Sequence, residues 1–197
     1  AREVGPLRRR YTLAAYLGEG AHVELNLDAS PWGLGAFLVV GDSIQSWFSC
    51  SLSDAELSLL GIQRGGCEAQ QAVEALCALV ALRAWTSFWH GGRALLRVRS
   101  DSVSALSLVL HLKSKGAAPA IIAREVALDV AASVYQPLIV EHVPGVANGI
   151  CDMLSRRYQP GKQYAIPSEL SGIAELELPE RTSGYFRSIR AAKQKGS

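Results

Sequence analysis

The architecture follows from residues 22–40, which read HVELNLDASPWGLGAFLVV. Apolar Val23, Leu25 and Leu27 alternate with polar residues, which is the period of a half-buried strand. The turn-forming residues that follow, and the apolar run 36–40 after them, predict a second strand that returns antiparallel to the first. The carboxylate of Asp28 would then lie at a strand end in mid-sheet. An isolated charge is costly there, so we expect a metal ion or a cationic partner, although an aspartate in such a turn also commonly bonds backbone N–H groups alone.

The composition is that of one globular domain, with 197 residues, of which 49% are hydrophobic and 19% charged. The net charge of +2 and the pI of about 8.4 are only mildly basic, so nucleic-acid contacts must come from local patches. The four cysteines lack the close pairs of a zinc site. They predict reduced core thiols in an intracellular protein, either cytoplasmic or nuclear. The sequence contains no apolar run of membrane-spanning length and no recognisable signal peptide.

The sequence predicts three parts: a lead-in over residues 1–21, an α/β domain over 22–157, and an extended basic tail over 158–197 with one short helix near 168–178. Within the domain, periodicity predicts strands over 22–28, 34–41, 43–49, 94–101 and 138–143, and helices over 67–89, 102–112, 119–135 and 147–157. The first three strands should form an antiparallel meander. The last two follow helices and should pair in parallel through crossovers. We therefore expect a five-stranded mixed sheet with helices on both faces.

Four carboxylates stand out by their positions in these elements. Asp28 and Asp101 end two strands, Glu68 opens the first long helix, and Asp152 lies in the first turns of the last helix. Strand ends, and the starts of the helices that follow them, meet at one edge of an α/β sheet. Carboxylates gathered there cannot all stay ionised without cations, and hard divalent ions suit oxygen ligands. Glu68 also suits the helix dipole, and Glu74, six positions on, is a rival on a different face.

Four blocks of the sequence carry a family signature. They are LDASPWGLGA over 27–36, CEAQQAVEAL over 67–76, RSDSVSA over 99–105 and EHVPGVANGICDMLSR over 141–156. In this order they resemble the ribonuclease H domains fused to reverse transcriptases of gypsy-type and DIRS-type retroelements. The resemblance covers about residues 22–157.

The resemblance implies a ribonuclease H-like fold and a metal-dependent endonuclease that hydrolyses the RNA strand of RNA–DNA hybrids, as part of a retroelement reverse transcriptase polyprotein. The implied metal ligands are Asp28, Glu68, Asp101 and Asp152. His142 would be the mobile-loop histidine that helps protonation or product release, although a histidine at a strand end is often only a surface residue. The implied cofactor is a pair of Mg²⁺ ions, which Mn²⁺ can replace, lying ~3.5–4 Å apart to activate water and to stabilise the leaving oxygen.

The resemblance also suggests substrate contacts and partners. The expected contact residues are Ser30, Gln71, Ser102 and Asn148. The implied partners are the RNA–DNA hybrid and a reverse transcriptase polymerase domain, in cis or in trans, with no membrane.

One departure from the family pattern bears on substrate affinity. The basic protrusion of some cellular relatives is not evident between residues 100 and 137, where only Lys113, Lys115 and Arg124 are available. The alternative interpretation is a catalytically inactive ribonuclease H-like tether or connection domain that binds nucleic acid or a polymerase without cutting. The intact set of carboxylates argues against it.

Overall fold

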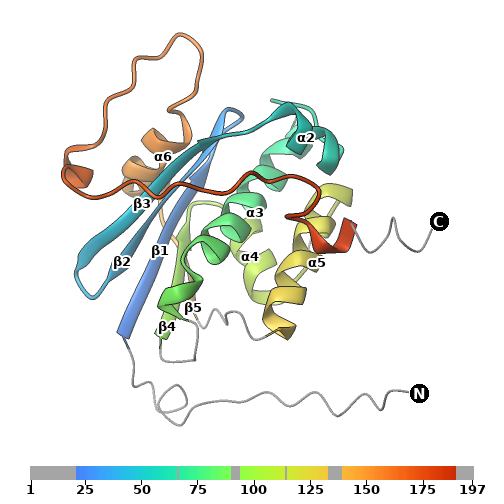
Figure 1. The fold of residues 1–197 in the computed structure, drawn as a ribbon, viewed down its shortest axis with the longest axis horizontal. Coiled ribbons are helices and arrows are strands. Elements are labelled where there is room, and N and C mark those ends of the chain that lie inside the picture. The colour runs from blue at the N-terminus through green and yellow to red at the C-terminus, as the bar shows by residue number, and fades with distance from the viewer. Residues whose placement is uncertain (1–20, 66, 90–93, 114, 133–138, 190–197) are drawn as a thin grey trace.

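The computed structural model describes residues 21–65, 67–89, 94–113, 115–132 and 139–189 (Figure 1). The expected lead-in lies outside the described residues except for Ala21. The end of the helix expected over 119–135 also lies outside them.

Five strands form one sheet in the order β3-β2-β1-β4-β5. Their bounds are β1 (Ala21–Ala29), β2 (Gly33–Val40), β3 (Ser43–Ser51), β4 (Ala94–Ser100) and β5 (Ile139–His142). β2 pairs antiparallel with both β1 and β3, whereas β4 runs parallel to β1 and β5 runs parallel to β4. This confirms the predicted α/β fold with three antiparallel strands followed by two parallel ones. The arrangement is consistent with a ribonuclease H-like fold.

Helices cover both faces of the sheet (Figure 1). One face carries α3 (Cys67–Ala84), α4 (Val103–His111) and α5 (Ala117–Ala131), and the other carries α6 (Gly149–Ser155). Leu25 and Leu27 of β1 lie in the main core with α3, while Leu154 of α6 lies in a separate buried cluster with Trp47 of β3. Side chains that alternate along the strands therefore point to opposite faces of the sheet, and each face has its own buried cluster.

The remaining elements are short. They are α2 (Asp54–Leu60), η1 (Thr86–Phe88), η2 (Gly145–Asn148) and η3 (Ser168–Leu170). The helix expected over 147–157 is divided between η2 and α6. The helix expected to open at Pro119 begins at Ala117 instead, because proline is tolerated throughout the first helical turn, where its missing N–H costs nothing.

The C-terminal turn of α6 is fixed to the sheet by a row of three residues, Asp28, Gly35 and Ser49, which pair across β1, β2 and β3. The Ser49 hydroxyl donates to the Leu154 carbonyl over 2.7 Å, and the Ser155 hydroxyl donates to the Asp28 carboxylate over 2.5 Å. The last carbonyls of a helix lack intrahelical partners, so Ser49 satisfies one of them. Gly35 leaves the necessary space, since an added Cβ would lie 2.4 Å from the Leu154 Cβ and 2.6 Å from the Ser155 nitrogen.

Substituting Gly35→Ala should lower the free energy of unfolding by about 1–3 kcal/mol, because the methyl group would overlap α6 backbone that cannot move alone. Urea unfolding measures the change. Gly149→Ala is the matched control: it adds the same group at a helical φ of −56° with no atom within 4 Å. This control should be neutral or stabilising by up to about 1 kcal/mol. Equal losses in both variants would contradict the docking.

The C-terminal segment, residues 158–189, wraps around the domain (the orange-to-red part of Figure 1). It passes edge strand β3, where the Leu176 N–H donates to the Trp47 carbonyl over 2.7 Å, and it ends with Phe186 fully buried in the main core. The described part of the expected tail, residues 158–189, is thus irregular but packed, because its apolar residues gain from burial. The only part of the expected helix over 168–178 that forms among the described residues is η3.

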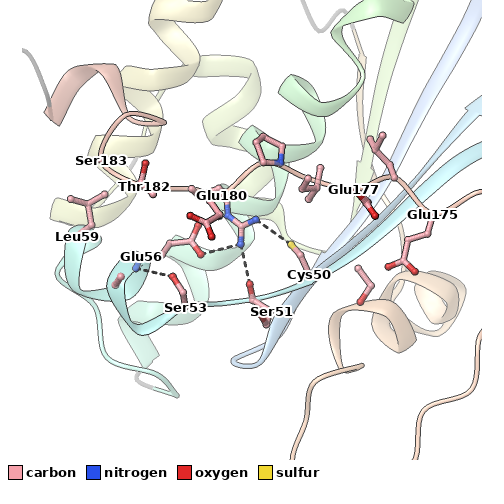
Figure 2. A pocket seen from close by; sticks show the side chains of 16 residues that line it. Cys50, Ser51, Ser53, Glu56, Leu59, Glu175, Glu177, Glu180, Thr182 and Ser183 are labelled. Atoms are coloured by element: carbon pink, nitrogen blue, oxygen red, sulfur yellow. Dashed lines mark hydrogen bonds and ion pairs between the residues drawn. The ribbon is translucent and has the colours of Figure 1, made fainter.

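An ion pair anchors this segment to α2. Arg181 pairs with Glu56, and both side chains are buried. The Arg181 guanidinium also donates to the Ser51 carbonyl over 3.0 Å. These residues line a pocket of about 930 Å³ between β3, α2 and the segment. Figure 2 shows Glu56, Ser51 and Cys50 among its lining side chains.

A second network anchors the segment to the helical layer. Arg83 of α3 pairs with Glu125 over 2.8 Å and with Asp129 over 2.7 Å, both on α5, and donates to the Tyr185 carbonyl over 2.7 Å. Arg187 of the segment also pairs with Asp129. The two α5 carboxylates are buried but are matched by cations, as buried charges require.

Substituting Phe186→Ala should lower the free energy of unfolding by about 3–5 kcal/mol, because it removes a fully buried ring. Ile166→Ala in the same segment, where the side chain is half exposed, should change it by less than about 1 kcal/mol. Urea unfolding of the two variants measures these changes and distinguishes a packed C-terminal segment from a solvated tail. Equally small effects would support the solvated tail.

Candidate functional site

Asp28 and Asp101 lie at the same edge of the sheet. Asn26 of β1 pairs with Arg99 of β4 in parallel, so each aspartate follows this pair by two residues. Asp28 is buried, with 9% of its surface exposed, whereas Asp101 lies exposed beyond the end of β4. The two carboxylates that were predicted to end neighbouring strands are therefore at one edge.

Burial raises the pKa of Asp28 from its ordinary 3.8 to about 7. The hydrogen bond from Ser155 opposes this increase, the negative charges of Asp101 and Asp152 add to it, and the positive charge of Arg156 opposes it. Asp28 thus stands in the negative potential of two other predicted site residues. A cation at this edge would relieve the repulsion.

Asp152 lies on α6, half exposed, and is held by an ion pair. Its Oδ1 accepts a hydrogen bond from the Arg156 Nε over 2.5 Å, one helical turn further on. The docking of α6 places Asp152 and Ser155 on the same side of the sheet as the Asp28 side chain. Arg156 thereby supplies a positive charge to this group of carboxylates.

Glu74 of α3 is connected to the end of β4. Its carboxylate accepts hydrogen bonds from the hydroxyls of Ser102 and Ser104, the first of which follows Asp101 directly. Gln70, four residues earlier, donates both to Glu74 and to the Ala29 carbonyl, each over 3.0 Å. Glu74 is thus tied to residues adjoining both Asp28 and Asp101.

The predicted ligand Glu68 lies in the first turn of α3, but its side chain falls outside what the structure describes. The two glutamates are six positions apart, which corresponds to about 9 Å along a helix axis and a rotation of about 120°. They therefore cannot occupy equivalent positions toward the sheet edge. The described contacts belong to Glu74.

Two predicted site residues lie at the end of β5 and in the connection from β5 to α6. His142 is exposed, and its Nε2–H donates to the Asp101 carbonyl over 3.1 Å. Asn148 is buried, and its side-chain amide donates to the Leu27 carbonyl over 3.2 Å. A Cβ added to Gly145 would lie 3.4 Å from the Asp101 Oδ2, so this loop passes close to that carboxylate. Asn148 holds the loop against β1, and His142 stays accessible.

Like Asn148, two more of the predicted substrate-contact residues have structural roles. Ser30 is 1% exposed and donates to the Ser155 carbonyl over 2.7 Å, so its hydroxyl anchors α6. Ser102 is the N-cap of α4, accepting from the Ala105 N–H over 3.2 Å while it donates to Glu74. Gln71 is exposed, but it faces a groove between helices.

Sequence reasoning missed the supporting residues Gln70, Ser155 and Arg156. Gln70 with Glu74, and Arg156 with Asp152, are spaced four residues apart, the spacing at which helical side chains interact, so this signal was available. No local signal identified Ser155, because its partner Asp28 lies 127 positions away.

The donor chemistry of this edge fits a hard divalent cation, because it consists of carboxylates and hydroxyls with a raised pKa at Asp28. Within the described ranges, however, no three histidine, cysteine, aspartate or glutamate side chains are grouped tightly enough to hold a metal ion. Among the described helices, none is both long and apolar enough to cross a membrane.

Known proteins provide no independent identification. No protein-family model, no curated protein and no solved structure matches this chain.

Substituting Asp28→Asn should stabilise the protein at pH 8 in EDTA by up to roughly 4 kcal/mol. The raised pKa means that the folded state binds the proton more tightly than the unfolded chain does. The contribution of Asp28 to wild-type stability is therefore greatest below about pH 4 and is lost as the pH rises through about 7. The advantage of the variant should shrink to near zero at pH 4. Urea unfolding at both pH values measures this.

The control is Asp42→Asn in the exposed β2–β3 turn, which should change stability little at either pH, because this side chain remains in water. An Asp28→Asn variant that gains no more stability at pH 8 than at pH 4 would contradict the burial of a carboxylate in a negative potential.

Proposed function

We propose that this chain is a metal-dependent endonuclease that hydrolyses the RNA strand of RNA–DNA hybrids, as the ribonuclease H domain of a retroelement reverse transcriptase. The observation that carries the proposal is the position of buried Asp28, whose pKa is raised mainly by burial and further by the negative charges of Asp101 and Asp152. A buried carboxylate with a raised pKa is costly to stability near neutral pH and is typical of functional sites. The sheet order and the resemblance of the four sequence blocks support the same conclusion.

The residues proposed to hold two Mg²⁺ ions are Asp28, Glu74, Asp101 and Asp152. Glu74 replaces Glu68 in this set because its contacts reach the residues that adjoin Asp28 and Asp101. When bound, the ions would lower the pKa of attacking water and stabilise the charge on the leaving oxygen.

The chain's own residues would prepare this site before any ion arrives. Ser155 fixes one oxygen of Asp28, and Gln70 with Ser102 and Ser104 fixes the Glu74 carboxylate. Preorganised ligands lose little conformational freedom when they bind an ion. Exposed His142 beside Asp101 is placed to give a proton to the departing oxygen at the same edge.

One observation favours the catalytically inactive alternative. The Arg156 guanidinium is bound to the Asp152 carboxylate and neutralises part of its charge. When an arginine neutralises part of the negative charge of the carboxylates, fewer divalent cations are needed to neutralise the rest. In that case the domain would serve as a tether that binds nucleic acid or a polymerase without cutting.

Cleavage of an end-labelled RNA–DNA hybrid with Mg²⁺ or Mn²⁺ tests the proposal, with single-stranded RNA and duplex DNA as substrate controls. We expect cleavage of the hybrid's RNA strand only. Asp101→Asn and Glu74→Gln should each reduce the rate at least about 100-fold, because each removes a ligand charge worth several kcal/mol. Glu68→Gln is the matched control and should change the rate by less than about threefold.

The outcomes separate the alternatives. Hybrid binding without cleavage, unchanged in Asp101→Asn, would support the tether. Cleavage that survives Asp101→Asn would show that another nuclease is responsible. Loss of activity in Glu68→Gln but not in Glu74→Gln would show that the metal ligand from α3 is Glu68.

A further inference from the structure

A groove of about 760 Å³ lies between α3, α4 and α5, on the face of the sheet opposite α6 (Figure 1). Its floor consists of buried apolar side chains, including Ala75 of α3, Leu108 of α4 and Ala123 of α5. Ala120 and Ala127 extend this apolar surface along α5 at helical spacing. Small residues on a helix let the larger side chains of another element approach closely.

The rim of this groove is positively charged. Lys113, Lys115 and Arg124 line it and are exposed, and the lining residues within the described part of the chain include no aspartate or glutamate. The ion pairs found among the described residues involve none of these three cations. An apolar floor below unpaired cations is complementary to an apolar surface flanked by carboxylates.

A protein fits this lining better than a nucleic acid does. The described lining contains no aromatic side chain on which a base could stack, and its apolar side chains outnumber Gln71, Ser104 and Ser107, the uncharged polar ones. The walls are helices, and a groove between helices accepts an amphipathic helix whose apolar residues recur at i, i+3 or i+4, and i+7.

We propose that this groove docks an amphipathic helix of a partner protein, with its apolar stripe on Ala75, Leu108 and Ala123 and with aspartate or glutamate side chains facing Lys113, Lys115 and Arg124. This interaction goes beyond the nuclease function and does not depend on it.

The test uses the full 197-residue chain and a fluorescein-labelled 18-residue helical peptide with leucine along one face and glutamate and alanine elsewhere. A second peptide carries lysine in place of every glutamate. Fluorescence anisotropy should show that only the acidic peptide binds. Lys113→Glu combined with Arg124→Glu should weaken its binding at least tenfold, whereas Lys162→Glu, an exposed cation outside the groove, should leave it unchanged.

A second variant tests the apolar floor without changing charge. Ala127→Trp fills the groove from α5 and should also weaken the acidic peptide at least tenfold, while circular dichroism and urea unfolding check that the variant stays folded. Failure of the acidic peptide to bind, equal binding of both peptides, or binding unaffected by the variants would overturn the proposal. A tenfold loss of RNA–DNA hybrid binding in the charge-reversal variant, without any peptide binding, would assign the groove to nucleic acid instead.

Discussion

The site depends on how the C-terminal turn of α6 rests on Ser49, Gly35 and Asp28. Ser49 satisfies a helix-end carbonyl, Gly35 provides the space, and Asp28 accepts the Ser155 hydroxyl. A short helix cannot hold itself in place by propensity, so these tertiary bonds determine where it lies. The same contact that seats α6 therefore brings Asp152 toward the edge where Asp28 and Asp101 lie.

This arrangement lowers the stability of the folded protein near neutral pH. Asp28 is buried beside other carboxylates, which raises its pKa to about 7 and makes its charged form costly near neutral pH. Stability must come from elsewhere, and the C-terminal segment is one source, through buried Phe186 and the Arg181–Glu56 ion pair. A domain that ended at residue 157 would lack both contacts.

The sequence predicted what depends on local periodicity. Strand alternation around Leu25 and Leu27 located the sheet, and the aspartates at two strand ends followed from it. The choice between Glu68 and Glu74 could not be made in this way, because both lie on one helix. The contacts of Glu74 with Gln70, Ser102 and Ser104 involve residues whose arrangement only the fold reveals. The packing of Phe186 and the bond from Ser155 to Asp28 depend on residues far apart in the chain, for which the sequence offers no local pattern.

The central claim is that carboxylates from β1, α3, the end of β4 and α6 share a divalent cation. Anomalous diffraction from crystals grown with Mn²⁺ tests it most directly. We expect manganese bound by Asp28 and Asp101 at about 2.1 Å, with Asp152 and Glu74, rather than Glu68, completing the site. Crystals that contain Mn²⁺ elsewhere, or none at this edge while Arg156 remains on Asp152, would contradict it.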